Sequence, residues 1–287
     1  MSVDLNGGIQ KFLVFNCLFV GLISSCASNH KDKVSYFESD RADQADFGSN
    51  TTVRSSELVI SAAASMQQVL EEISELYAQR YPQVKLVFNF GSSGSLQHQI
   101  EQGAAADLFI SAAPQQMNQL ADKQLLKSNT RQDLVENQMV LVAPSDRNTV
   151  GKFANLKDRT VEQIALGEPN SVPAGQYAHE ILTSLQLADA VEPKAIYGKD
   201  ARQVFNYVAT GNVDAAIVYR TDALHAKQVA IVDVPPESAY SAVVYPVAVM
   251  RESKNILAAE QLLEFLFSAE AQAAFQRYGF LPAKQTH

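Results

Sequence analysis

The sequence has few cysteines and few basic residues, and both shortages exclude whole classes of function. Its 287 residues include 2 cysteines, Cys17 and Cys26, both near the amino terminus. Because no cysteine follows Cys26, the rest of the chain can form neither a disulfide framework nor a thiolate metal site. Lys and Arg number 23 against 31 Asp and Glu, which gives a net charge of −8. This balance argues against a nucleic-acid partner, because phosphate backbones are bound by clustered Lys and Arg.

The usual signatures of metal sites and catalytic centres are also missing. The 5 histidines are scattered without HxxxH or HExxH spacing, so we expect no structural metal and no cofactor. The segment 91–95 (GSSGS) is no P-loop, because no Gly-Lys-Ser/Thr follows it, and Ser95 stands where a nucleophile elbow needs its second glycine. An enzyme would need an activated nucleophile or an acid/base pair. In the four loops described below, Asp200 is the one His or carboxylate, so we expect a protein that is not an enzyme.

The amino terminus is predicted to be an export signal. Residues 12–25 (FLVFNCLFVGLISS) form an apolar run of signal-peptide length that is too short for a comfortable membrane span. The run ends in Ile23-Ser24-Ser25-Cys26, which resembles a bacterial lipobox, where small residues precede a cysteine that is acylated. We therefore expect a lipoprotein signal peptide over 1–26 with Cys26 as the lipid anchor; an ordinary signal peptide cut nearby is the alternative. The polar segment 27–56 is predicted to be a flexible tether. The protein would be exported to the periplasm or cell envelope and held at a membrane.

From residue 57 onward, short β runs alternate with helical stripes. The predicted strands are 58–60, 84–90, 107–111, 139–142, 163–166, 195–197, 215–219 and 243–250, and a long helical stretch covers 255–277. Strands separated by helices indicate an α/β fold with parallel, doubly wound sheets. Because the pattern restarts after 139–142, we expect two lobes, one over 57–138 with 246–287 and the other over 139–245, joined near Val140 and Val247. Pro246 predicts that its strand is an edge or connecting strand, since proline cannot donate to a ladder.

Four loops share an arrangement that suits an anion: a strand ends, small or hydroxylated residues follow, and a helix begins. Helix starts offer unpaired N–H groups and the positive end of the helix dipole. The loops are 62–65, 91–95, 172–175 and 199–203. Ser65 with Gln68, and Asp200 with Gln203, also match a capping box, so a plain helix cap is the alternative for both. The pattern alone predicts a two-lobed protein with several helix starts that could hold an anion.

Six segments together resemble the periplasmic molybdate-binding proteins of ABC importers. They are AAASMQQVLEEI, FNFGSSGSLQHQIEQGAAADLFISAA, LGEPNSVPAGQYAHEIL, DAAIVYRTDA, VVYPVAVM and AQAAFQRYGF, in the order of that family and over 57–282. The resemblance implies a type II periplasmic-binding fold, in which two doubly wound α/β lobes are joined by two crossover strands around a ligand cleft. It implies molybdate, and tungstate beside it, as the bound ligand.

The resemblance also implies a set of binding residues. In that family the oxyanion is bound by two serines, a tyrosine and backbone N–H groups. Matched by motif, the serines are Ser65 and Ser93, the main-chain donors are Ala174 and Ala201, and the tyrosine is Tyr219. Family members often have valine where this chain has Ala201, a mild change because the N–H alone is used.

The second loop departs from the family pattern and leaves an alternative open. It reads GSSGS where the familiar form is alanine followed by three serines, so Ser92 and Ser95 compete with Ser93 for the ligand.

The function implied is capture of molybdate by a monomeric binding protein that delivers it to a membrane permease with its ATPase. Another tetrahedral oxyanion, sulfate or phosphate, is the alternative. A hydrolase, a ferric-ion binder and a ligand-sensing regulator are less favoured, because catalytic groups, a cluster of iron-binding tyrosines and a DNA-binding module are not found in the sequence.

Overall fold

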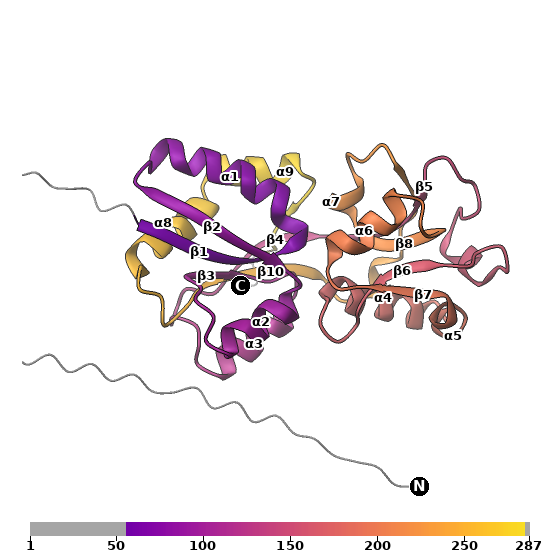
Figure 1. Ribbon diagram of the computed structural model, residues 1–287, viewed down its shortest axis with the longest axis horizontal. Coiled ribbons are helices and arrows are strands. Elements are labelled where there is room, and N and C mark those ends of the chain that lie inside the picture. The colour runs from indigo at the N-terminus through magenta and orange to yellow at the C-terminus, as the bar shows by residue number, and fades with distance from the viewer. Residues whose placement is uncertain (1–55, 285–287) are drawn as a thin grey trace, which may run out of the picture. The chain divides into compact units, whose positions relative to one another are not determined.

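The computed structural model describes residues 56–284, which form two lobes, each built on its own β-sheet (Figure 1). The predicted signal peptide, Cys26 and the tether up to residue 55 lie outside the described residues. Within 56–284, no helix is long and apolar enough to cross a membrane.

Lobe 1 is built on a six-stranded sheet with the order β11-β4-β10-β3-β1-β2. Strand β1 pairs in parallel with β2 and β3, whereas β10 runs antiparallel to β3 and β4, and β11 runs antiparallel to β4. The elements of lobe 1 are β1 (Ser56–Ala63), a 3-10 turn (Ala64–Met66), α1 (Gln67–Arg80), β2 (Val84–Gly91), α2 (Ser93–Glu101), β3 (Leu108–Ile110), α3 (Pro114–Asp122), β4 (Gln132–Asn137), β10 (Val243–Val249), α8 (Ile256–Leu266), α9 (Ala269–Arg277) and β11 (Leu281–Pro282).

Lobe 2 is built on a five-stranded sheet with the order β7-β6-β8-β5-β9. Strand β6 pairs in parallel with β7 and β8, and β5 runs antiparallel to β8 and β9. Its elements are β5 (Met139–Pro144), a 3-10 turn (Phe153–Lys157), β6 (Ile164–Gly167), α4 (Pro173–Ser184), α5 (Ala188–Val191), a 3-10 turn (Glu192–Lys194), β7 (Ala195–Gly198), α6 (Ala201–Ala209), β8 (Ala215–Tyr219), α7 (Arg220–Ala223) and β9 (Val229–Asp233).

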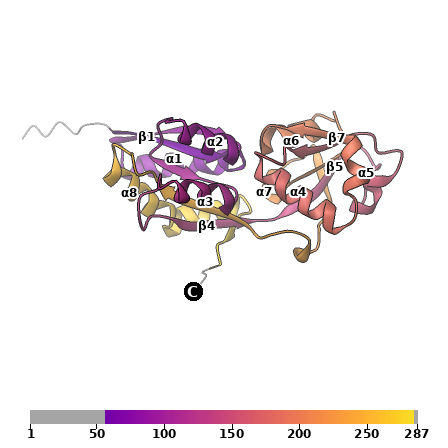
Figure 2. The same cartoon turned by 90° about the horizontal axis from the view of Figure 1, so that it is seen from below.

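The chain crosses between the lobes twice (Figure 2). Strand β4 ends at Asn137 and β5 begins at Met139, so the first crossover is nearly a continuous strand. The second crossover runs from the end of β9 at Asp233 to the start of β10 at Val243 and contains a 3-10 turn (Glu237–Ala239). The lobe boundaries predicted at 138/139 and 245/246 remain predictions. The chain passes from one sheet to the other between β4 and β5 and between β9 and β10, close to both positions.

The predicted α/β alternation, with two lobes, is confirmed, but the sheets are mixed and not wholly parallel. The prediction that Pro246 marks an edge strand is wrong, because β10 pairs with β3 on one side and β4 on the other. The alternative prediction of a connecting strand agrees with the chain order, since the second crossover from lobe 2 leads into β10. The register shifts between Tyr245 and Pro246, and such a bulge interrupts the ladder where proline lacks its N–H.

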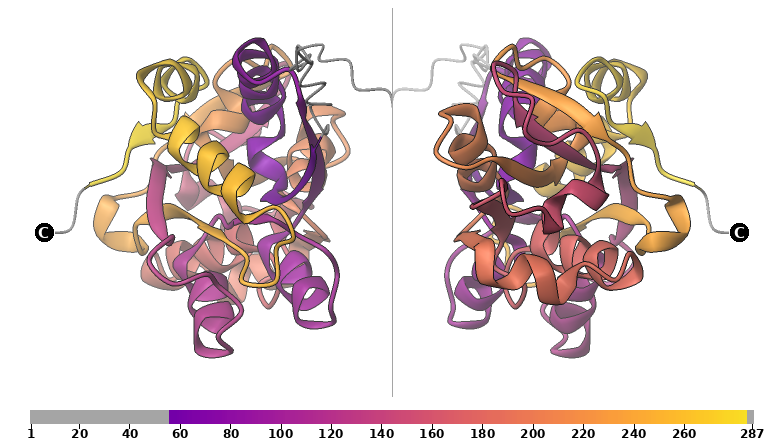
Figure 3. Two further views of the ribbon diagram at one scale, coloured as in Figure 1. Left: turned by 90° about the vertical axis from the view of Figure 1, so that its left-hand side faces the viewer. Right: turned by 90° about the vertical axis from the view of Figure 1, so that its right-hand side faces the viewer.

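The helical stretch expected over 255–277 is two helices. Helix α8 ends at Leu266, and the side chain of Ser268 accepts a hydrogen bond from the N–H of Ala271 and caps α9. Both helices pack beside α1, where Figure 3 (left) draws them in yellow next to indigo.

Candidate functional site: a cleft lined by neutral donors

A small cavity lies between the lobes, where the amino-terminal ends of several helices meet. The cavity has a volume of about 10 Å³. The residues that line it come from both lobes and none has a charged side chain: Ala63, Ala64, Ser65, Gly91, Ser92, Ser93, Ala112, Val172, Pro173, Ala201 and Tyr219. The four loops predicted to suit an anion therefore converge on one place.

Ser65 does not cap a helix, contrary to the capping-box alternative. The 3-10 turn Ala64–Met66 separates β1 from α1, so Met66 takes the N-cap position and no side chain caps α1. The Ser65 hydroxyl is therefore free of its own helix. Its Oγ lies 2.9 Å from the hydroxyl oxygen of Tyr245 on β10, and Ser65 lines the cavity.

In the second loop the three serines have different partners. Ser92 is the N-cap of α2: its Oγ accepts from the N–H of Ser95 at 3.2 Å and donates to the Ser95 hydroxyl at 2.8 Å. Ser93 is fully buried, and its Oγ accepts from the backbone N–H of Ala112 at 2.9 Å. Ser93 therefore keeps its own hydroxyl proton for a further acceptor, whereas Ser92 gives its proton to Ser95, and Ser95 is exposed and does not line the cavity. This geometry favours Ser93 among the three.

The third loop leads into α4 and also touches lobe 1. Proline at the first helical position, Pro173, suits the start of α4 because its missing N–H is not needed there. Val172 and Pro173 line the cavity; Ala174 follows them, buried, in the first turn, and does not itself line the cavity. The carbonyl oxygen of Ser171 accepts a hydrogen bond from the N–H of Gly94 on α2 at 3.0 Å, which joins the lobes.

The fourth loop carries the cap that was predicted for it. Asp200 Oδ1 accepts from the N–H of Gln203 at 2.9 Å, so the carboxylate faces its own helix α6 and does not line the cavity. The Gln203 side chain accepts from the N–H of Lys199. Ala201, the first residue of α6, lines the cavity, and Gly211 follows the end of the helix with a φ of +71°.

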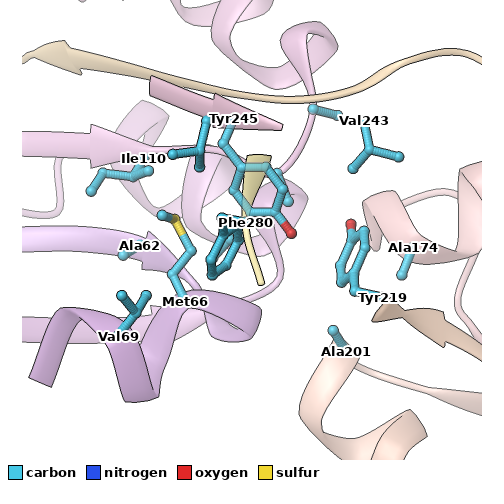
Figure 4. Packing of buried hydrophobic residues seen from close by; sticks show 14 of the residues in the cluster. Ala62, Met66, Val69, Ile110, Ala174, Ala201, Tyr219, Val243, Tyr245 and Phe280 are labelled. Carbon is cyan, nitrogen blue, oxygen red and sulfur yellow. The ribbon is translucent and has the colours of Figure 1, made fainter. Parts of the chain in front are cut away.

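Tyr219 contributes a buried hydroxyl that has no hydrogen-bond partner among the described residues. Its side chain lies at the end of β8 and is 1% exposed. Burial raises the pKa of Tyr219 well above its usual value, so the hydroxyl is a proton donor at neutral pH. Tyr219 lines the cavity, so its hydroxyl is available to a solute there. Figure 4 shows the hydroxyl groups of Tyr219 and Tyr245 pointing toward one another from opposite lobes.

One charged group close to the cleft was not predicted. Asp222 lies on α7, its Oδ2 is buried, and that atom has no hydrogen-bond partner within 56–284. Burial raises the pKa of Asp222 to about 7, against the opposing charge of Arg202. Its charge also acts on Tyr219 and Tyr245. Asp222 belongs to none of the four predicted loops, and no local pattern indicates that its carboxylate is buried.

Four of the five predicted binding residues, Ser65, Ser93, Ala201 and Tyr219, line one cavity, and Ala174 lies next to it in the chain. Among the described residues, no group of His, Cys, Asp and Glu is arranged to hold a metal ion. Two α/β lobes joined by two crossovers, with a neutral donor site between them, define a binding protein that encloses a small solute.

Comparison with known proteins identifies the family. Residues 58–281 match the family described as bacterial extracellular solute-binding protein, and the chain belongs to it. The chain is 47% identical over 224 residues to YvgL of Bacillus subtilis, named as an ABC transporter substrate-binding lipoprotein, with 78% of this chain and 85% of that one covered. It is 38% identical over 233 residues to the molybdate-binding protein ModA of Haemophilus influenzae, with 79% and 90% covered.

A solved structure agrees with these relatives. The substrate-binding domain of a molybdenum ABC transporter from Clostridium difficile is similar with a TM-score of 0.64 and 43% sequence identity, and covers 80% of this chain and 100% of that chain. Membership in a family of solute-binding proteins agrees with the prediction that the protein is not an enzyme.

Proposed function

We propose that the cleft binds molybdate, and tungstate with it, through Ser65, Ser93, Tyr219 and the backbone N–H groups of Ala174 and Ala201. The observation that carries the proposal is the lining of the cavity, which offers neutral hydroxyl donors and helix starts but no charged side chain. Molybdate at neutral pH is a fully deprotonated dianion that can only accept hydrogen bonds. A cage of donors therefore satisfies every one of its oxygens without a counter-charge.

The same chemistry separates the competing anions. Hydrogen phosphate keeps a proton, which would need an acceptor such as a carboxylate, and the lining holds none. Sulfate also lacks a proton, so the size of the cavity must discriminate against it. Molybdate and tungstate are nearly equal in size, and we expect the site to bind both. The names of the relatives ModA and the molybdenum transporter domain support molybdate over sulfate.

We also propose that the loaded protein delivers its anion to an ABC permease with its ATPase, while anchored to a membrane through Cys26. The name of the relative YvgL, a transporter lipoprotein, supports both parts. Closure of two lobes around a solute by a hinge is the usual motion of such proteins, and the two crossovers supply the hinge here.

Thermal unfolding with a panel of ligands tests the proposed ligand. At a concentration one hundred times its dissociation constant, a bound ligand adds about 2.7 kcal/mol of stability, which raises the Tm of a protein of this size by roughly 5–10 °C. We expect molybdate and tungstate to do this, and sulfate, phosphate and ferric ion to do far less at equal concentration. Equal stabilisation by sulfate or phosphate contradicts the assignment.

Membrane fractionation tests the anchor. Cys26→Ala is expected to move the protein from the membrane to the soluble fraction, whereas Cys17→Ala, inside the predicted signal peptide, is expected to leave it at the membrane. Continued membrane attachment of the Cys26 variant contradicts the proposed lipid anchor.

A further inference from the structure

A chain of buried hydrogen-bonding groups runs from the first crossover to Ser65. Asn137, the last residue of β4, has its Nδ2 3.3 Å from the hydroxyl oxygen of Tyr245, and that oxygen is 2.9 Å from Ser65 Oγ. Asn137 is 6% exposed and Tyr245 is 0% exposed. Because Asn137 and Tyr245 are buried, their protons must be donated to other groups of the protein or to a ligand, whereas Ser65 is partly exposed at the cleft.

The orientation of the Asn137 amide is fixed by the backbone. The N–H of Gln138 donates to Asn137 Oδ1 at 2.8 Å. Because an N–H needs an acceptor, the atom facing Gln138 must be the amide oxygen of Asn137 and not its amide nitrogen. The amide nitrogen therefore faces the other way, 2.9 Å from the Thr221 hydroxyl oxygen and 3.3 Å from that of Tyr245. Its two protons serve these two oxygens, so Asn137 acts toward Tyr245 as a donor.

The direction of the next hydrogen bond follows from the first. Tyr245 accepts from Asn137 and has one proton of its own, which burial keeps in place by raising the pKa of the hydroxyl. Ser65 Oγ is the partner within reach of that proton, and an unpaired buried hydroxyl proton costs about 1–3 kcal/mol. The 2.9 Å distance allows either hydroxyl to donate; because Asn137 already donates to Tyr245, we assign Tyr245 as the donor and the Ser65 oxygen as the acceptor in this bond.

We propose that Asn137 and Tyr245 are positioning residues that fix Ser65 as a hydrogen-bond donor toward the cleft. This inference rests on the proposed binding of a tetrahedral oxyanion. With its oxygen taken by Tyr245, the Ser65 hydroxyl has its proton left for the ligand. The oxygen of Ser93 likewise accepts a hydrogen bond, from the N–H of Ala112, so its hydroxyl proton is also left for a ligand. Both serines thus turn protons toward the cavity before the ligand arrives.

The consequence is selection by protonation state. An oxyanion without protons can accept a hydrogen bond from both serines. A protonated oxygen at Ser65 would place two donors against one another, and no hydrogen bond would form there. Loss of the Tyr245 hydroxyl lets the Ser65 hydroxyl rotate and accept. We therefore expect the preference for molybdate over hydrogen phosphate to shrink, beyond a plain loss of affinity for both.

A double-mutant cycle by titration calorimetry tests this relay. Tyr245→Phe keeps the ring that packs against Phe280 and Tyr219, and removes the hydroxyl alone. We expect it to weaken molybdate binding by roughly 3- to 10-fold, the range of one neutral hydrogen bond. In a Ser65→Ala background the same change should have no further effect, because its target is gone. Tyr77→Phe, at a buried tyrosine on α1 that does not line the cavity, is the matched control and should leave affinity unchanged.

Each outcome decides between the two proposals. If wild type binds no oxyanion of the panel, the proposed function fails and the relay falls with it. If wild type binds and Ser65→Ala weakens binding, but the two effects multiply in the double variant, the relay alone is contradicted. An unchanged ratio of molybdate to hydrogen phosphate affinity in Tyr245→Phe also overturns it.

Asn137→Leu provides a second test should Tyr245→Phe unfold. Leucine is close to asparagine in size and has no hydrogen-bonding group or charge, so Tyr245 loses its donor and is free to accept from Ser65. We expect the same loss of affinity and selectivity, again absent in the Ser65→Ala background. Full molybdate affinity in a folded Asn137→Leu variant contradicts the relay.

Discussion

The backbone N–H of Gly94 donates to the carbonyl oxygen of Ser171 at 3.0 Å, and this bond joins the two lobes beside the cleft. A Cβ added at Gly94 would lie 2.5 Å from that oxygen, too close for any side chain. The contact can form because residue 94 is glycine. It ties the start of α2 to the residue before the predicted loop 172–175, so a backbone hydrogen bond holds these two segments together.

Gly94→Ala is predicted to weaken ligand binding without weakening the fold. The added methyl group blocks approach of the lobes at Ser171, and overpacking of this kind costs about 1–3 kcal/mol, or roughly 5- to 150-fold in affinity. Alanine is also the better helix former, so the Tm of the ligand-free protein should not fall. Calorimetric titration and thermal unfolding measure the two effects. Gly151→Ala, where the nearest atom to an added Cβ is 3.8 Å away, is the control.

The serine hydroxyls make the most direct prediction for binding. Ser65→Ala and Ser93→Ala each remove a donor to a charged ligand, worth about 1.5–3 kcal/mol, so each should weaken molybdate binding by roughly 10- to 150-fold. Ser95→Ala is the matched control, because Ser95 pairs with Ser92 and does not line the cavity. If the Ser95 variant loses as much affinity as the other two, the assignment of Ser93 is wrong.

Tyr219→Phe should separate binding from folding. The ring and its packing remain, while the buried hydroxyl that lacks a partner is removed. Ligand-free stability is expected to stay equal or to rise, since an unsatisfied buried group is destabilising. Affinity for molybdate should fall by roughly tenfold or more, as expected for one lost donor to an anion. A drop in ligand-free Tm with unchanged affinity would mean that the hydroxyl serves the fold.

Asp222 predicts how stability depends on pH. The pKa of its carboxyl is raised from 3.8 to about 7, so between these values the folded state binds a proton that the unfolded chain has lost. Stability therefore falls as pH rises through this window and stays at the lower level above it. Asp222→Asn removes the effect and should be more stable than wild type at pH 8 by at most about 4 kcal/mol, with little difference at pH 4.

Urea unfolding at pH 4, 6 and 8 measures this difference. The exposed Asp146→Asn variant is the control for a change of charge alone. If the gain in stability of Asp222→Asn is the same at pH 4 as at pH 8, the carboxyl does not titrate as described.

Much of the fold could be predicted from the sequence because its signals are local. The β runs and helical stripes from residue 57 onward fixed the positions of most elements, and the cap at Asp200 needed a spacing of three residues. The prediction of an edge strand at Pro246 failed because a bulge, which no local pattern predicts, lets proline lie in a strand that is paired on both sides. Strands β4, β9 and β11 were missed. The antiparallel pairing of the predicted strands β10 with β3 and β5 with β8, which makes the sheets mixed, was also not predicted.

The candidate site shows the same limit. Ser65, Ser93, Ala201 and Tyr219 were found through motifs, and they converge on the cavity. The Ser65 hydroxyl was open to a capping role, and its real partner, Tyr245, lies 180 positions away. The hydrogen bonds of Asn137 and Gly94 also join segments far apart in the chain, so no local pattern predicts them.

Anomalous X-ray scattering from a crystal grown with tungstate locates the bound oxyanion itself. We expect one tungsten peak in the cleft, with its oxygens within hydrogen-bonding reach of Ser65, Ser93 and Tyr219. We expect that peak to be lost in a Ser65→Ala, Ser93→Ala double variant at the same tungstate concentration. A peak elsewhere on the molecule with an empty cleft, or a cleft peak that persists at full occupancy in the double variant, would contradict the proposed site.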